Sequence, residues 1–263
     1  MTENPPEAPE EHSSLPLSRM RRLIARHLTK TVSSMIPVTL CDDFEVTALY
    51  EARKERMTQT ESDGRKLTYL PFFIKAAVSA LQADSRFNAT LEESTMDLSA
   101  PPEDRLAAVR YTVHSEYNIG YAVDTPDGLM VLNVKQADTK SLGEIAAEIE
   151  EKSARLRTTR KVSSLEDVTG GTFTISNIGA LGASYSTPLM NYPEVAILAP
   201  GRMREQVALH KGKVVMRNNI PVIVKMLPVS LTFDHTWVDG ADAARFLQSF
   251  GGFLGSQEEL SRL

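Results

Sequence analysis

The chain is poor in several residue types that mark particular classes of protein. It has one cysteine, Cys41, among 263 residues, so no internal disulfide can form, as expected in a reducing cytoplasm or organelle matrix. The formal net charge of −5 gives no electrostatic reason to bind nucleic acid. No apolar run approaches the roughly 20 residues that cross a bilayer. We therefore expect neither nucleic-acid partners nor membrane spans, and the start of the chain lacks the basic and apolar regions of a secretory signal.

The first 16 residues differ in composition from the rest. They contain four glutamates and four prolines but no lysine or arginine. Such a segment cannot bury enough apolar surface to offset the entropy lost on ordering, so a flexible arm is expected. After it, helical and strand patterns alternate without a second linker or an internal repeat. The sequence therefore predicts an acidic, Pro-rich arm over residues 1–16 and one domain over residues 17–263.

Local signals place the secondary structure of this domain. Ser18 is a good N-cap, and Ser141 with Glu144 forms a capping box. Helices are predicted over 18–36, from 47, over 71–81, from 141 and over 241–254. Strands are predicted over 38–46, 117–125, 129–135, 171–176, 194–200 and 221–234, the second and third joined by a turn at 126–128. This order indicates an α/β (α+β layered) fold in which helices cover a sheet.

The stretch VSLTFDHTWVDGADAARF, residues 229–246, places a histidine at the end of an apolar strand. His235 is followed by Asp239 and by Gly240, which permits a tight turn. A catalytic base needs a fixed tautomer and orientation, and a nearby acidic or carbonyl group supplies both. The spacing leaves two interpretations open: a catalytic base, or a strand-end histidine satisfied by local hydrogen bonds.

The other histidines carry weaker signals. His12 falls in the arm, His27 lies on a predicted helix beside arginines, and His114 and His210 lie in polar stretches expected to be exposed. We interpret them as surface or packing residues. No second histidine or cysteine cluster offers ligands at metal spacing, so no metal site is predicted.

A second stretch, GGTFTISNIGALG (170–182), reads as a strand that closes at Ser176 and is followed by a glycine turn. Together with HTWVDG and the GADAARF helix, it resembles the catalytic domain of the dihydrolipoamide acyltransferases, the core components of 2-oxo-acid dehydrogenase complexes. Further blocks follow in the family's order: PLSRMRRLIARHL, IPVTLCDDFEVTALYEARKE, LTYLPFFIKAAVSAL, YNIGYAVDTPDGLMVLNVKQAD and NYPEVAILAPGRM. The resemblance implies a chloramphenicol acetyltransferase-like fold, a mixed β-sheet covered by helices.

The resemblance also implies roles for three residues. His235 matches the family's general base, which takes a proton from the thiol of coenzyme A or of dihydrolipoamide so that the sulfur attacks a thioester. Ser176 matches the hydroxyl that donates a hydrogen bond to the tetrahedral oxyanion. Asp239 matches the aspartate that holds the active-site loop, through a salt bridge to an arginine.

Coenzyme A is the substrate that the resemblance implies, together with a lipoyl group supplied by another domain or chain. The family threads coenzyme A in extended form, with basic side chains near its phosphates. From charge alone Arg21, Arg22 and Lys211 are candidates, against the alternative that they are solvated surface charges. The acyl group leans towards the acetyl or branched-chain types on the blocks TISNIG and PEVAIL.

The resemblance further implies a homotrimer, in which the histidine and the serine of one site come from different chains. Ser176 and His235 can then lie far apart within one chain. In this family trimers join into cubic or dodecahedral shells through an apolar C-terminal anchor. Here that end, SQEELSRL, offers only Leu260 and Leu263 as apolar residues. The resemblance therefore predicts a trimer, and a larger shell remains an open alternative.

Some positions depart from the family. Thr236 replaces the usual arginine after the histidine, Trp237 follows where an aliphatic residue is usual, and Leu132 stands where proline is common. Trp237 is interpreted either as packing or as part of the channel wall. The lipoyl domain usual in the family is not recognised. Three functions stay open: acyl transfer between dihydrolipoamide and coenzyme A, coenzyme A-dependent acetyl transfer to another acceptor, and a non-catalytic scaffold.

Overall fold

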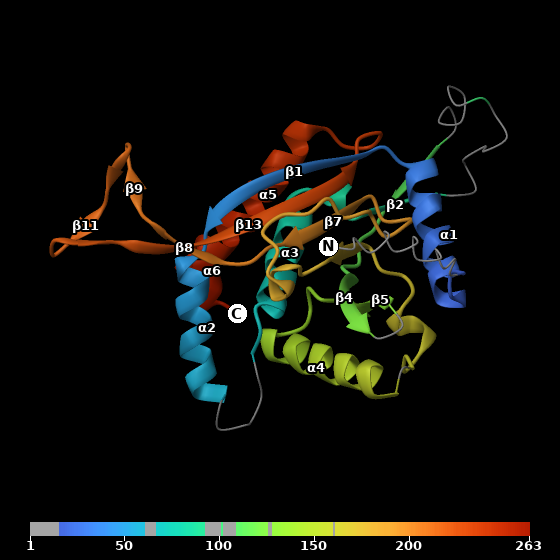
Figure 1. The fold of residues 1–263 in the computed structure, drawn as a ribbon, viewed down its shortest axis with the longest axis horizontal. Coiled ribbons are helices and arrows are strands. Elements are labelled where there is room, and N and C mark those ends of the chain that lie inside the picture. Colours follow the sequence, from blue (N-terminus) through green and yellow to red (C-terminus); the bar gives the residue numbers. More distant parts are fainter. Residues whose placement is uncertain (1–15, 61–66, 93–100, 102–108, 126–127, 160) are drawn as a thin grey trace, which may run out of the picture.

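A mixed β-sheet runs through the molecule, and its two ends carry the residues of interest (Figure 1). The computed structural model describes residues 16–60, 67–92, 101, 109–125, 128–159 and 161–263. The arm expected over residues 1–16 falls outside the described residues apart from Pro16, as do positions 126 and 127 of the expected turn.

Six strands follow one another across the sheet in the order β1, β13, β7, β6, β4, β5, and a seventh, β8, pairs with the start of β13. Their bounds are β1 Pro37–Glu45, β4 Ile119–Thr125, β5 Gly128–Val134, β6 Phe173–Ile175, β7 Ala196–Pro200, β8 Arg204–Val207 and β13 Ile223–Asp234. Every residue of β6 and β7 is buried, as are the last eight of β13. These strands do not alternate between buried and exposed residues, because the centre of the sheet is covered on both faces.

Strand direction decides where functional residues emerge. β4, β6 and β7 run parallel, so their carboxyl ends meet at one edge of the sheet. β13 runs antiparallel to β7, so its carboxyl end reaches the opposite edge. We call these the Ser176 end and the His235 end, after the residues that follow β6 and β13.

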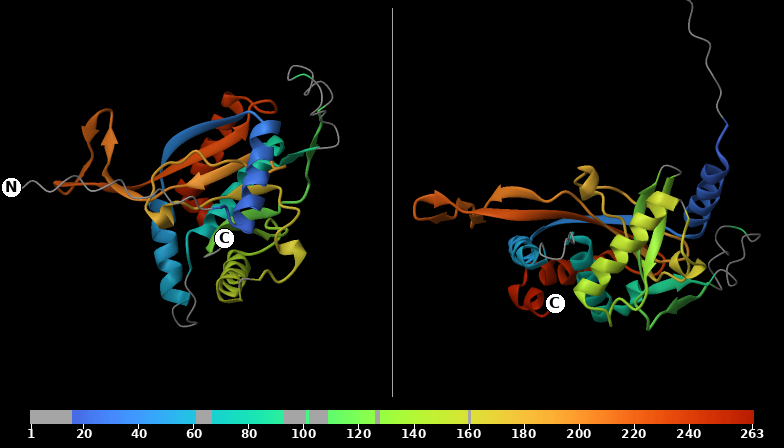
Figure 2. Two further views of the ribbon diagram at one scale, coloured as in Figure 1. Left: turned by 45° about the vertical axis from the view of Figure 1, so that its right-hand side comes forward. Right: turned by 90° about the horizontal axis from the view of Figure 1, so that it is seen from below.

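Helices cover the sheet and enclose the core (Figure 2). Their bounds are α1 Arg19–Ser34, α2 Thr47–Thr60, α3 Leu70–Ala83, α4 Leu142–Thr159, α5 Gly240–Gly255 and α6 Gln257–Ser261. The apolar α3 and α5 pack against each other, and Phe246 of α5 contacts Phe87 and Phe173 with ring centroids 4.6 and 5.6 Å apart. α1 stands at the side of the body, with most of its residues exposed.

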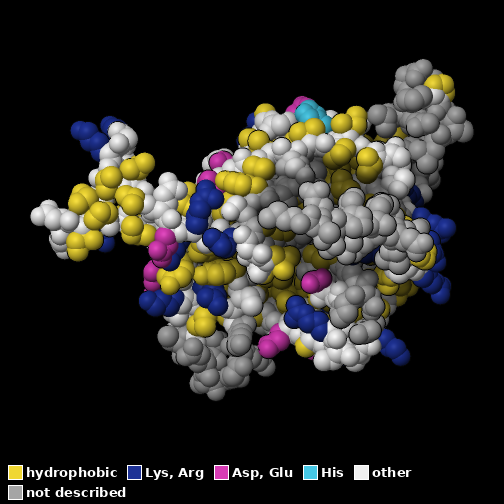
Figure 3. All heavy atoms as spheres, in the orientation of Figure 1, with side chains coloured by type: hydrophobic (Ala, Val, Ile, Leu, Met, Phe, Trp, Pro, Cys, Tyr) yellow, Lys and Arg dark blue, Asp and Glu magenta, His cyan; other side chains and the backbone are white. Residues whose placement is uncertain are grey.

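Two short hairpins project from the sheet beyond β8 and β13 (Figures 1 and 2). They are β9–β10 (Leu209–His210 with Lys213–Val214) and β11–β12 (Met216–Arg217 with Ile220–Pro221). The central residues of both turns have positive φ, with values of 50° and 75° at Lys211 and Gly212, which suits a tight two-residue hairpin turn. Figure 3 shows apolar side chains along this projection.

The sequence predictions for the long elements are confirmed. Ser18 Oγ accepts a hydrogen bond from the Arg21 backbone N–H at 3.2 Å, and the Ser141–Glu144 capping box forms. The predicted layered fold, a mixed sheet covered by helices, is also confirmed. The ribbon of β2 (Ala89–Leu91) and β3 (Tyr111–Val113), the two projecting hairpins and α6 were not predicted, because each is too short for a periodic pattern.

The C-terminal leucines do not form a free anchor. Leu260 of α6 is fully buried in the core of its own chain, and Leu263 packs partly buried against the same core. The apolar surface that the sequence assigned to contacts between trimers is therefore largely used within the subunit.

Candidate functional site

His235 lies on a turn whose backbone is held on several sides. Its backbone N–H donates to the carbonyl of Ile36 at 2.8 Å, and its ring packs at 5.7 Å from the ring of Phe233. The preceding Asp234 is fully buried, and its carbonyl accepts hydrogen bonds from the N–H groups of Trp237 and Val238. The His235 side chain nevertheless stays 41% exposed, so a rigid backbone presents an accessible imidazole.

Asp239 lies near this imidazole but does not hydrogen-bond to it. Its Oδ1 is 3.9 Å from His235 Nδ1, beyond hydrogen-bond distance, and its side chain is 81% exposed. It occupies the N-cap position of α5.

Within one chain, the arginine close to the start of α5, Arg86, pairs with Asp242 and not with Asp239. Arg86 binds both carboxylate oxygens of Asp242, at 2.8 and 2.9 Å. The Asp242 carboxylate also accepts from the backbone N–H of Asp239 at 3.2 Å. Hydrogen bonding to Arg86 lowers the pKa of Asp242 to about 2, so the pair stays charged. The helix start is thus held by a carboxylate three residues further along, inside the first turn of α5.

Ser176 directly follows β6 at the other end of the sheet. Its backbone N–H donates to the carbonyl of Leu198 at 2.8 Å, which continues the parallel pairing of β6 with β7. The side chain is half-buried, and the next residue, Asn177, lines a cavity. Ser176 therefore lies at the carboxyl end of β6, next to the segment that lines this cavity.

Within one chain Ser176 and His235 are not brought together. The pairing of Ile175 with Leu198 puts Ser176 level with Ala199, which pairs with Ser230 of β13. His235 lies five residues beyond Ser230, which corresponds to about 17 Å along the strand. No single subunit can then place both side chains on one reacting carbonyl.

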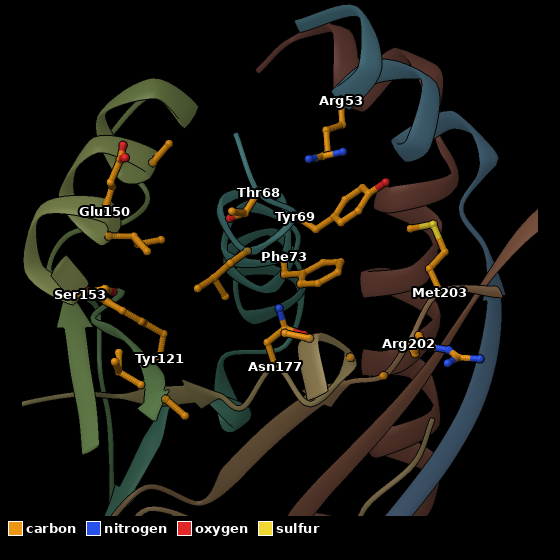
Figure 4. Close-up of a pocket in the computed structure, with 18 of the residues that line it drawn as sticks. Arg53, Thr68, Tyr69, Phe73, Tyr121, Glu150, Ser153, Asn177, Arg202 and Met203 are labelled. Atoms are coloured by element: carbon orange, nitrogen blue, oxygen red, sulfur yellow. The ribbon is translucent and has the colours of Figure 1, made fainter. Parts of the chain in front are cut away.

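A cavity of about 730 Å³ opens at the Ser176 end (Figure 4). Its walls come from α3, α4, β4, the segment after β6 and the segment after β7, and three arginines are among its lining residues: Arg53, Arg157 and Arg202. Figure 4 shows the guanidinium of Arg53 above Tyr69 and the amide of Asn177 pointing inward, while Arg202 turns its guanidinium outward.

Arg53 is fixed more firmly than a surface arginine. Its Nε donates to the carbonyl of Leu67 at 2.8 Å, and its guanidinium lies 4.6 Å from the centre of the Tyr69 ring. Stacking and this hydrogen bond hold the planar fork at the mouth of the cavity, where it can bind an anionic group.

The basic residues predicted from charge lie elsewhere. Arg21 and Arg22 are exposed on α1, and Arg22 Nη1 bonds to the carbonyl of Leu17 at 2.6 Å. Lys211 occupies the turn of the β9–β10 hairpin, which projects on the opposite side of the molecule from α1 (Figure 1). None of the three lines the cavity. Sequence reasoning missed Arg53 because nothing in its helical pattern sets it apart from neighbouring cations; only the contact with Tyr69 does.

The remaining singled-out residues have structural contacts. Leu132 is buried in β5 opposite Tyr121. His27 bonds Asn191 at 3.0 Å, and His114, expected to be exposed, is half-buried with Nε2 2.8 Å from Thr90 Oγ1. In the part of the chain that the structure describes, no three His, Cys, Asp or Glu side chains gather as metal ligands, and no helix is long and apolar enough to cross a membrane.

The sequence matches a family model described as 2-oxoacid dehydrogenases acyltransferase (catalytic domain), over residues 9–261. Two curated relatives are dihydrolipoyllysine-residue acetyltransferase components of pyruvate dehydrogenase complexes. The one from Acholeplasma laidlawii is 37% identical over 88% of this chain and 38% of its own length. The one from Staphylococcus epidermidis is 35% identical over 96% of this chain and 53% of its own length. The chain thus spans about half, or less, of these relatives.

Two solved structures share the fold over nearly their whole length. One is the dihydrolipoamide acetyltransferase of Azotobacter vinelandii, with a TM-score of 0.82 and 31% identity over 99% of this chain and 100% of that chain. It was studied for a serine, a histidine and an asparagine in its catalytic mechanism, the last two being four positions apart. The other is a truncated catalytic core of the Thermoplasma acidophilum 2-oxoacid dehydrogenase complex, with a TM-score of 0.74 and 33% identity over 94% of this chain and 99% of that chain.

Proposed function

Since the chain belongs to the 2-oxoacid dehydrogenase acyltransferase family, we propose that it transfers an acyl group between dihydrolipoamide and coenzyme A. The family match over residues 9–261 carries this proposal, because it includes Ser176 directly after β6, His235 directly after β13 and Asp239 at the start of α5. We take the acyl group to be acetyl, the group named for the curated relatives. The protein would work in the cytoplasm or an organelle matrix as the core of a 2-oxoacid dehydrogenase complex, with the lipoyl group on another domain or chain.

We propose His235 as the general base. An ordinary thiol has a pKa near ~8.5 and is mostly protonated at neutral pH, so its proton must be removed before the sulfur attacks. The imidazole takes this proton, and the sulfur forms a bond to the thioester carbonyl carbon. When the tetrahedral intermediate collapses, the original carbon–sulfur bond breaks and the leaving thiolate recovers the proton from His235. The exposed ring on a fixed backbone supports this role.

Ser176 is the proposed donor to the oxyanion of that intermediate, and Asp239 a support for the turn. A single oxyanion donor is typically worth ~10²–10³ in rate. The Azotobacter vinelandii enzyme has a histidine and an asparagine at the spacing of His235 and Asp239. A neutral amide at that position supports a positioning role for Asp239 rather than a role in carrying a proton.

Each site would require two copies of the chain, because about 17 Å separates Ser176 from His235 along the strands of one copy. We propose a homotrimer in which one subunit supplies the serine and its neighbour the histidine. Another solved structure that resembles this chain, with a TM-score of 0.82 and 30% identity, is the cubic core of a pyruvate dehydrogenase multienzyme complex. A cubic or dodecahedral shell of this chain would need contacts other than Leu260, which is buried in its own subunit.

The cavity at the Ser176 end is the proposed site for the phosphate-bearing part of coenzyme A. Arg53 is the residue best placed to bind a phosphate group, because stacking and one hydrogen bond already fix its side chain. This replaces Arg21, Arg22 and Lys211, whose positions on α1 and on the projecting hairpin do not converge.

The test is acetyl transfer from acetyl-coenzyme A to free dihydrolipoamide. The unmodified protein should be active, His235→Ala should lose about 10²–10⁴-fold in kcat, and Ser176→Ala about 10²–10³-fold. His210→Ala, which removes an exposed histidine from a projecting hairpin, is the control and should keep its activity. Transfer to other thiol or amine acceptors but not to dihydrolipoamide would refute the proposed acceptor, and no turnover with any acceptor would favour a scaffold.

A further inference from the structure

We propose that Tyr111 and Trp237 are positioning residues that hold the His235 turn in its catalytic orientation. The inference rests on the proposed acyl transfer, in which His235 is the base. Tyr111 comes from β3, in the separate ribbon formed with β2, and Trp237 from the turn itself. Their contacts join the turn to two parts of the fold that are remote in sequence, and neither residue touches the reacting atoms in this scheme.

The buried carboxylate of Asp234 is the centre of this arrangement. Its Oδ1 accepts hydrogen bonds from the backbone N–H groups of Ile36, at 3.0 Å, and Thr236, at 3.1 Å. Its Oδ2 accepts from the Tyr111 hydroxyl at 2.9 Å. These donors flank His235, whose own N–H is bound to Ile36. Desolvation and the adjacent carboxylate raise the pKa of Tyr111, so its hydroxyl remains a donor.

Trp237 closes the other side of the turn. Its ring stacks on that of Tyr111, with centroids 4.5 Å apart and planes 20° apart. Its Nε1–H donates to the carbonyl of Arg86 at 2.8 Å, and the Arg86 side chain binds Asp242 at the start of α5. The residues before and after His235 are thereby linked to one aromatic pair. This explains why the chain carries tryptophan at a position where the resemblance led us to expect an aliphatic side chain.

Catalysis by His235 should therefore depend on contacts that its neighbours make and that its own side chain does not make. A base contributes its full rate factor only in a near-attack position, and a displacement of about 1 Å can cost about 10²-fold. If Tyr111 loses its hydroxyl, one oxygen of a fully buried carboxylate loses its donor. The turn must then move to satisfy that oxygen, because an unsatisfied buried acceptor is costly.

The first experiment compares Tyr111→Phe with Tyr185→Phe. Both remove a tyrosine hydroxyl bound to an aspartate, but the Tyr185 hydroxyl bonds Asp43 at 2.8 Å, away from the turn. Tyr111→Phe should lower kcat by about tenfold or more with KM for acetyl-coenzyme A within about twofold of the unmodified value. Tyr185→Phe should change neither. A kcat for Tyr111→Phe within about twofold of that of the unmodified enzyme would overturn the proposal.

The second experiment does not depend on turnover. Amide hydrogen exchange is followed over residues 234–238 in the unmodified assembly and in both variants. Exchange in this peptide should be at least about tenfold faster in Tyr111→Phe and unchanged in Tyr185→Phe. Trp237→Phe, which keeps a ring but loses the donor to Arg86, should give an intermediate increase. Unchanged exchange in both Tyr111→Phe and Trp237→Phe would overturn the positioning role.

The two experiments separate this inference from the function on which it rests. An unmodified protein without transfer activity refutes the proposed acyltransferase and with it the catalytic meaning of the turn. Activity in the unmodified protein together with an unaffected Tyr111→Phe refutes the positioning residues alone.

Discussion

The two ends of the central sheet differ in how tightly their polar groups are enclosed. At the His235 end, polar groups are buried and bound: Asp234 accepts three hydrogen bonds, and Arg86 joins Asp242 to the turn. At the Ser176 end, the parallel strands open onto a cavity of about 730 Å³, and Arg157 and Arg202 on its rim are exposed. One end is closed around a small turn, and the other leaves room.

This difference follows from what each end would do in acyl transfer. A base must be oriented before the substrate arrives, and fixed hydrogen bonds provide that at no cost during the reaction. A long, charged substrate must enter and leave, so its binding end needs space and accessible cations. Neither end is complete alone. Substitutions at three places test this difference: at the closed end, along the helix that links the ends, and at the open end.

Glu194 provides the largest expected effect, at the closed end. It is fully buried, accepts hydrogen bonds from Thr174 Oγ1 at 2.5 Å and Asn191 Nδ2 at 2.9 Å, and lies near the charged side chain of Lys135. Burial raises the pKa of Glu194 to about 7. In the unfolded chain this carboxyl has an ordinary pKa of ~4.5. Its contribution to the stability of the fold is therefore fully present below about that pH. This stabilisation is lost as the pH rises through about 7.

Glu194→Gln should remove this pH dependence, since the amide keeps the shape and does not ionise. The free energy of unfolding of the variant, minus that of the unmodified protein, should therefore rise by about 2–3 kcal/mol when the pH is raised from about 5 to about 8. Urea unfolding at both pH values measures it, with Glu51→Gln on the exposed face of α2 as the control. A constant difference between Glu194→Gln and the unmodified protein at the two pH values would contradict the expectation.

Helix α5 links the two ends and packs tightly against β1 at Gly251. A Cβ at Gly251 would lie 2.1 Å from Cδ1 of Phe44, whereas one at Gly252 would meet nothing within 4 Å. Gly251→Ala should therefore destabilise the fold by about 1–3 kcal/mol through overpacking. Gly252→Ala should stabilise it by about 0.5–1 kcal/mol, because alanine loses less entropy in a helix. Thermal unfolding of the two variants gives the sign of each change, and equal shifts would show that Phe44 yields without cost.

The smallest effect is expected at the open end. Arg53→Ala should raise KM for acetyl-coenzyme A by about tenfold, the value of one well-placed charge-assisted contact, and leave kcat within about twofold. Lys54→Ala, an exposed neighbour on the same helix, should leave KM unchanged. Steady-state kinetics at fixed dihydrolipoamide measures both. If KM stays constant in Arg53→Ala, the phosphates bind elsewhere, and Arg157 and Arg202 become the next candidates.

The sequence was sufficient to predict long helices and strands and to find residues that belong to linear motifs. Ser18, Ser141 with Glu144, and the apolar run that ends at Asp234 each carry their signal locally, and the structure confirms these predictions. His235, Ser176 and Asp239 came from blocks that keep their spacing in a family. The family itself is confirmed, whereas the roles of these residues remain predictions.

What the sequence could not provide are pairings between distant segments. Tyr111 and Asp234 are 123 positions apart, and Arg86 and Asp242 are 156 apart, so no local pattern relates them. The same holds for the partner of Arg86, because which of two nearby aspartates it binds depends on the direction of the first turn of α5. The arginine expected for Asp239 stays a prediction. Arg53 was missed because its significance arises only when the segment before α3 folds back over α2.

The pairing of β1 with β13 has a consequence for how the protein is made. Ile36 and Asp234, joined by a hydrogen bond, are 198 positions apart. At about 5–20 residues per second, roughly 10–40 s of translation separate them. Until β13 emerges, β1 has no neighbour in the sheet, because β13 separates it from β7. The nascent chain thus holds the strands that surround Ser176 before the turn bearing His235 exists, and its first strand stays without a partner until almost the whole chain has been made.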